Sequence, residues 1–88
     1  MLTKTHYTKP FIITPELTAL LTLLADIQSK GEATVFFSLQ GHVNRIHVMV
    51  FIPEWRPGKD PDYSLEAYSD NTSRIQSITE EIKREFDY

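Results

Sequence analysis

The stretch of sequence that decides the fold is Thr34–Ile52, TVFFSLQGHVNRIHVMVFI. Apolar residues alternate along both of its halves, and Gln40–Asn44 between them supplies the residues of a turn. The pattern predicts a β-hairpin with strands at about 34–39 and 45–52. Pairing the two strands across this turn brings their aliphatic residues to one face, as a register set by burial requires.

The two faces of this hairpin differ in character. One face is aliphatic, and we expect it to be core that needs no functional explanation; it comprises Val35, Phe37, Leu39, Ile46, Val48, Val50 and Ile52. The other face carries Phe36, His47, Met49 and Phe51. A half-buried hairpin needs only one apolar face, so the second must be covered by the chain itself or by another molecule.

Helical patterns stand on both sides of the hairpin. Thr14 is a good N-cap, Pro15 suits the first helical position, and Gly31 is a natural stop. After a third strand at about 63–69, a cap-rich segment leads into a helix at about 72–86, whose isoleucines follow helical spacing. The order is therefore α-β-β-β-α.

This order predicts one α+β domain over residues 1–88, built as a two-layer sandwich. Three antiparallel strands form a meander, and two helices pack on one of its faces. Residues 1–13 are a lead-in, in which Phe11–Ile13 forms either a short edge strand or an apolar contact with the first helix. Pro53–Asp62 contains three prolines and is a loop.

Composition limits the function classes. The net charge is −3 and there is no cysteine, so a thiolate metal site is excluded and phosphate binding has no basic footprint. No apolar stretch resembles a signal peptide or is long enough to span a bilayer, and we expect a cytoplasmic protein with no membrane partner.

No catalytic motif is present. The glycines are isolated, so there is no phosphate-binding loop, and no serine lies in a nucleophile motif. His42 and His47 have no partners at metal-ligand spacing. We expect no catalytic residue, no metal and no cofactor, and hence a non-enzymatic protein.

The second sheet face is the candidate binding site. Aromatic and apolar groups with a polar rim are typical of protein interfaces. The expected binding residues are Phe36, His47, Met49, Phe51, Trp55, Arg56 and Tyr68. If the face is open, a homodimer through the sheet faces or through an edge strand is the economical solution, and the protein partner is otherwise unknown.

Two alternatives stay open. Phe11–Ile13 or the 53–62 loop could fold over the second face and bury it within the monomer. The same aromatic face could instead bind single-stranded nucleic acid by stacking, although the negative net charge makes nucleic acid the weaker partner.

The hairpin also carries a family resemblance. Phe37-Ser38-Leu39-Gln40-Gly41-His42-Val43-Asn44, followed by alternating aliphatic residues and Trp55, resembles a hairpin of small uncharacterised phage and prophage proteins. The chain departs from that pattern at Pro53-Glu54, where a glycine would precede the tryptophan. The resemblance implies an accessory protein of phage or prophage origin that works by binding another protein.

Overall fold

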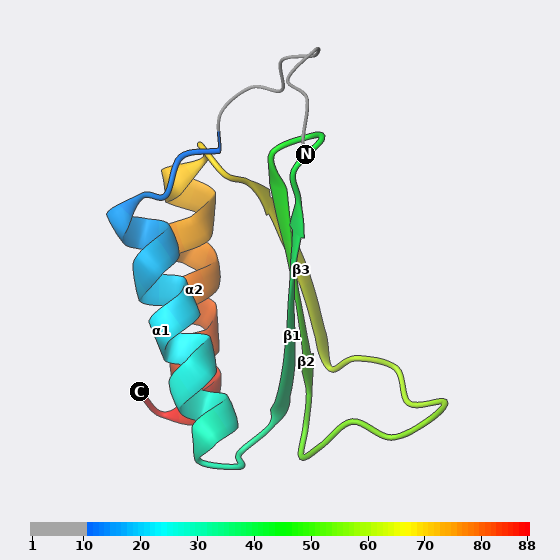
Figure 1. Ribbon diagram of the computed structural model, residues 1–88. Helices are drawn as coiled ribbons and strands as arrows, with labels where there is room; N and C mark the ends of the chain where they lie inside the picture. The colour runs from blue at the N-terminus through cyan, green and yellow to red at the C-terminus, as the bar shows by residue number, and fades with distance from the viewer. Residues whose placement is uncertain (1–10) are drawn as a thin grey trace.

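The computed structural model describes residues 11–88 and has the element order α-β-β-β-α (Figure 1). Its elements are α1 (Pro15–Ser29), β1 (Thr34–Gln40), β2 (Arg45–Phe51), β3 (Tyr63–Tyr68) and α2 (Thr72–Phe86). The strands form one antiparallel sheet in the order β1-β2-β3, and both helices lie side by side on one of its faces. The predicted α+β sandwich is confirmed.

The helix ends use the expected residues. The Thr14 hydroxyl accepts a hydrogen bond from the Leu17 N–H at 3.2 Å, and Pro15 occupies the first turn of α1. Gly31 follows α1 with a φ of 71°, a conformation that glycine adopts without steric cost. At α2, the side-chain oxygen of Asn71 accepts from the Arg74 N–H at 3.1 Å.

The hairpin has the predicted register, with Leu39 opposite Ile46 and Val35 opposite Val50. Its turn uses positive φ at Asn44. Between the sheet and the helices lies a single apolar core. Its buried members are Leu17, Leu20, Leu23, Leu24, Ile27, Ala33, Ile46, Val48, Val50, Ala67, Ile75, Ile78 and Ile82.

The expectation that the whole aliphatic face is core is wrong for Leu39, near the end of β1. Val35 and Phe37 are only partly buried, and Leu39 is 53% exposed, although each faces the helices. A four-residue connection holds the start of β1 near the end of α1, where the Gln28 side chain accepts from the Val35 N–H at 2.8 Å. The far end of β1 extends beyond that contact, so Leu39 is left uncovered.

The described part of the lead-in, residues 11–13, does not form the edge strand that was one of its two expected structures. Residues 11–14 form no strand, and Phe11 packs against the core while Ile12 and Ile13 are exposed. The edge-strand alternative for Phe11–Ile13 is therefore wrong. The remainder of the predicted lead-in, residues 1–10, lies outside the described residues.

Candidate functional site

The strand register brings five of the expected binding residues together on the sheet face that points away from the helices. Phe36 of β1 is opposite Met49 of β2, and Phe51 lies two residues further along the same face. On the other side of β2, Arg45 is opposite Tyr68, and His47, also on this face, is two residues from Arg45. We call this surface the aromatic face; it comprises Phe36, His47, Met49, Phe51 and Tyr68.

The loop between β2 and β3 extends on the side of this face (Figure 1). The Trp55 N–H donates to the Thr34 hydroxyl at 2.9 Å, which places the loop beside the end of the aromatic face. The Asp62 carboxylate accepts from the Ile52 N–H at 2.6 Å, and the Lys59 ammonium donates to the Ile52 carbonyl. These bonds hold the two ends of the loop against each other.

The loop carries a charge-dependent contact. The hydrogen bond from the Ile52 N–H lowers the pKa of Asp62 below its usual value, and the Lys59 ammonium, 3.5 Å from the carboxylate, lowers it further. The ionised carboxylate is thus the form that the folded loop favours.

Coverage of the aromatic face is uneven. Phe51, opposite Thr34 and beside the loop, is only 4% exposed, whereas Phe36 is 40% exposed. The two rings meet edge to face with centroids 5.5 Å apart. Phe51 therefore cannot contact a partner directly; it holds the exposed Phe36 ring in one orientation. The loop covers one end of the face, and Phe11–Ile13 does not bury the rest.

The opposite end of the face is open and polar. Tyr68 is 53% exposed, and the Arg45 guanidinium lies over its ring at 5.4 Å from the centroid. Arg45 also forms a 2.7 Å ion pair with Glu66, and this hydrogen bond raises the pKa of the guanidinium. The cation is therefore already neutralised by a neighbour on the same face.

A hydrogen bond joins His47 to Ser64 across β2 and β3, with 2.8 Å between Nε2 and the hydroxyl oxygen. A hydroxyl and an imidazole at this distance are two parts of a nucleophile–base pair. The third part would be a carboxylate that orients the imidazole, but Glu66, opposite His47, is engaged by Arg45. The bond lies on an exposed sheet face, where water is not excluded, and its clear effect is to fix the histidine ring.

The remaining expected binding residues, Trp55 and Arg56, stand in the loop and not in a strand. Trp55 is 47% exposed, so its indole ring is accessible at the border of the aromatic face. Arg56 is also exposed and lies 3.8 Å from Glu54. Both residues are therefore available to a partner, but at one end of the face.

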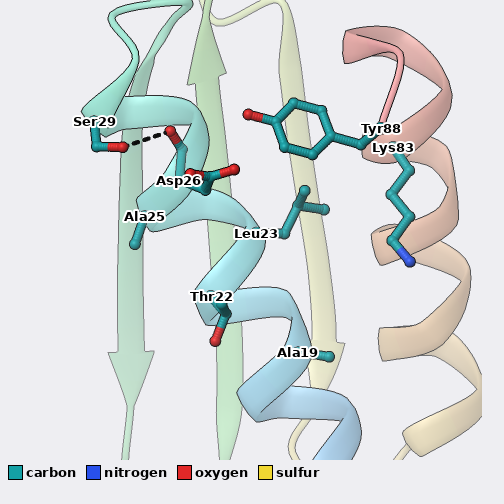
Figure 2. A pocket seen from close by; sticks show the side chains of 8 residues that line it. All are labelled: Ala19, Thr22, Leu23, Ala25, Asp26, Ser29, Lys83 and Tyr88. Atoms are coloured by element: carbon teal, nitrogen blue, oxygen red, sulfur yellow. Dashed lines mark hydrogen bonds between the residues drawn. The ribbon is translucent and has the colours of Figure 1, made fainter.

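A second concave region lies between α1 and the C-terminal end of α2 (Figure 2). It is an open groove of about 700 Å³, lined on the α1 side by residues that include Leu23, Asp26 and Ser29. Tyr88 closes one side, and its hydroxyl donates to Glu32 at 3.1 Å. Ser29 donates to the backbone carbonyl of Asp26 at 2.8 Å, as the dashed line in Figure 2 shows.

Charged groups in and beside this groove are paired with neighbours, Asp26 with Lys30 and Lys83 with Glu80. Lys30 forms a 3.2 Å ion pair with Asp26 and lies 4.7 Å from the centroid of the Tyr88 ring. The hydrogen bond that the Lys30 ammonium donates to Tyr88 and the ion pair with Asp26 raise the pKa of Lys30. The groove therefore offers an apolar depression with a self-neutralised rim, and no nucleophile–base pair is assembled in it.

Two further properties concern the described part of the chain only. Within residues 11–88, no three histidine, aspartate or glutamate side chains are grouped so as to hold a metal ion. Neither of the two helices combines the length and the apolar character that crossing a membrane would require.

No family model, curated protein or solved structure matches this chain. The geometry of the aromatic face and of the sheet edges therefore carries the functional inference.

Sequence reasoning missed several contacts that shape the face. Glu66 pairs with Arg45 and Ser64 pairs with His47, and neither pair was predicted. The β2–β3 register would have predicted both pairs, but deriving that register requires the bounds of the loop between the two strands. Gln28, which caps the edge of β1 from a helix, had no local signal.

Proposed function

We propose that this protein is a non-enzymatic binding protein that acts through protein–protein contact at its sheet and works as a homodimer. The observation that carries the proposal is the aromatic face, where Phe36 and Tyr68 remain exposed on a rigid sheet. Its setting would be that of a cytoplasmic accessory protein of phage or prophage origin, as the hairpin resemblance implies.

The chemistry of the face supports a protein partner. Exposed aromatic rings surrounded by polar groups are the composition of interface centres, in which Tyr, Trp and Arg contribute most of the binding energy. The rings are also preorganised, because Phe36 rests on the buried Phe51 and Tyr68 stacks under Arg45. Little side-chain entropy is then lost when a partner binds.

Single-stranded nucleic acid is the second candidate, and the stacking of Arg45 on Tyr68 is what favours it. Phosphate binding, however, requires a cation whose charge is available. Arg45 is paired with Glu66 at 2.7 Å, so a protein surface is the better-supported partner.

The test is affinity capture from a lysate of the native host, with the full-length protein as bait. The bait variant F36S/Y68S removes both exposed rings, and the matched control Gln76→Ser changes an exposed residue of α2, in the helix layer. We expect a protein that is retained by the wild type and the control and depleted at least about tenfold by the double variant, a change that corresponds to a loss of about 1.4 kcal/mol.

Equal capture by all three baits would contradict the aromatic face as the contact surface. A fluorescence titration with a labelled single-stranded oligonucleotide at low salt separates the second candidate. Salt-sensitive binding that is lost in F36S/Y68S, without any captured protein, would replace protein contact by nucleic-acid binding.

A further inference from the structure

One edge of the sheet is chemically open. Alternate residues of an antiparallel edge strand point their N–H and C=O groups away from the sheet. In β1 these are Val35, Phe37 and Leu39, because the Val35 N–H reaches Gln28 on the outer side. Among residues 11–88, only Val35 has a partner for its outward N–H, so Phe37 and Leu39 present unpaired backbone groups.

The side chains of β1 do nothing to protect this edge. Its seven residues, TVFFSLQ, contain no charge and no proline, the two devices that most often block strand pairing. Beside the strand, Leu21 is partly exposed on α1 and Leu39 is 53% exposed. An apolar groove lined by Leu21, Leu24, Val35 and Phe37 follows the same edge.

We propose that β1 pairs with β1 of a second copy, antiparallel and about a two-fold axis at Ser38, to form a continuous six-stranded sheet. The inference rests on the proposed function, in which the protein works as a homodimer, and it names the surface and the register. The open groups select that register. It sets Phe37 opposite Leu39 of the other copy, so that the outward N–H and C=O groups of these two residues find partners on each strand.

The same register preserves contacts that already exist. Val35 falls opposite Gly41 of the other copy, so the Gln28 cap on its N–H need not be broken. Ser38 meets Ser38 at the axis, where a non-hydrogen-bonded pair brings Cα atoms to about 4.5 Å and small side chains fit best. A register centred on Phe37 would instead require the Val35 N–H to leave Gln28.

This pairing would add contacts on the helix side of the sheet and join the aromatic faces on the other side. On the helix side, the exposed Leu39 would lie beside Phe37 of the other copy. On the other side, a two-fold axis normal to the sheet places both aromatic faces on one surface, with each Phe36 near the axis. The partner-binding surface of the proposed function would then be doubled in area.

Size limits the strength of the dimer. A seven-residue strand is about 23 Å long, and one sheet layer with one helix layer is about 20 Å deep, so each copy buries about 500 Å². This is the lower end of specific interfaces. We expect an exchanging dimer with a micromolar dissociation constant.

The chain has no cysteine, so a single introduced cysteine reports the register directly. Ser38→Cys places two sulfurs at a separation that a disulfide spans. Ser64→Cys is the matched control, since Ser64 is also an exposed strand serine on the aromatic face but belongs to β3. Under mild oxidation we expect Ser38→Cys to cross-link about 100-fold faster than Ser64→Cys.

Adding Leu39→Lys to the Ser38→Cys chain should reduce cross-linking to the rate of the control, because an ammonium group would enter the edge pairing. Circular dichroism of each variant checks that the fold is kept. Light scattering of the wild type from about 1 µM to about 500 µM measures the dimer itself.

Equal cross-linking of Ser38→Cys and Ser64→Cys would overturn the edge pairing in favour of contact between sheet faces, and the proposed homodimer would stand. A wild type that is monomeric throughout the concentration range would overturn the pairing as well.

Hydrogen exchange supplies a further check, since slow exchange of the Phe37 and Leu39 amides in a dilute monomer would mean that the chain covers its own edge. Equal capture by the wild type and F36S/Y68S, together with fast cross-linking of Ser38→Cys, would instead contradict only the aromatic face as a partner site.

Discussion

The two edges of the sheet are built in opposite ways. At the β3 edge, the outward carbonyl of Glu66 accepts from Arg74 Nε at 3.4 Å, and that of Tyr68 accepts from the Asn71 N–H at 3.0 Å. At the β1 edge, Gln28 caps only the Val35 N–H. β3 also carries a charged residue and follows Pro61-Asp62, whereas β1 is uncharged.

This difference shows what keeps an edge strand from pairing. A capped carbonyl and a charged side chain make strand addition costly, because the charge would lose water and the cap would have to leave. β3 has both devices in its C-terminal half, at Glu66 and Tyr68, and β1 lacks them at Phe37 and Leu39. The asymmetry implies that association through β1 is tolerated or used.

The largest contrast concerns two apolar residues directly opposite each other on the helix side. Ile46 is 0% exposed in the central strand, and Leu39 is 53% exposed at the edge. We expect Ile46→Ala to lower the free energy of unfolding by about 3 kcal/mol and Leu39→Ala by less than about 1 kcal/mol. Urea unfolding of the dilute protein measures both.

If Leu39→Ala were as destabilising as Ile46→Ala in the dilute protein, Leu39 would be covered within the monomer. The β1 edge would then resemble the β3 edge, and the comparison between them would fail.

A smaller effect is expected from the two side-chain caps. Arg74→Met and Gln28→Met keep a long helical side chain but remove its hydrogen bond to the edge backbone. Each should cost about 1 kcal/mol or less, because the freed groups can bond to water. Urea unfolding gives the stability, and light scattering gives the association state.

The two substitutions should differ in their effect on the association state. Arg74→Met frees a carbonyl on the edge that is otherwise protected, so we expect species larger than a dimer to appear at high concentration. Gln28→Met adds one open group to an edge that is already open, and should leave the association state unchanged. An Arg74→Met protein that associates no further than the wild type would show that charge, and not capping, protects β3.

The smallest expected effect is the pH dependence at the start of β3. The pKa of Asp62 lies below its ordinary value of 3.8, chiefly through the Ile52 N–H. A lowered folded-state pKa contributes stability that is present above the unfolded value and is lost as the pH falls through the folded value. The stability difference between the wild type and Asp62→Asn should therefore shrink below pH 3.8, as followed by thermal unfolding. A difference that stayed constant down to about pH 2 would contradict the loop contact.

Local pattern was sufficient for the fold. The Thr14 cap and the cap-rich segment before the second helix, the alternation of the strands and the helical spacing of the isoleucines predicted every element, because each depends on neighbours in the sequence. The hairpin register followed from burial, and it also placed Phe36, Met49 and Phe51 on one face.

Exposure within that face could not be predicted in the same way. Phe36 and Phe51 share the face, yet Phe36 is open and Phe51 is buried, because the loop returns to Thr34, directly opposite Phe51. The pairing of Arg45 with Glu66 likewise depends on where β3 lies along β2.

The sequence by itself determined the order of the elements, the register of the hairpin and the separation of an aliphatic from an aromatic face, since these follow from periodicity and from the chemistry of caps and turns. Only the tertiary structure decided how much of each face is covered. Coverage depends on where two helices and one loop come to rest over three strands, and that placement leaves Leu39 and Phe36 open on opposite sides of the same edge strand.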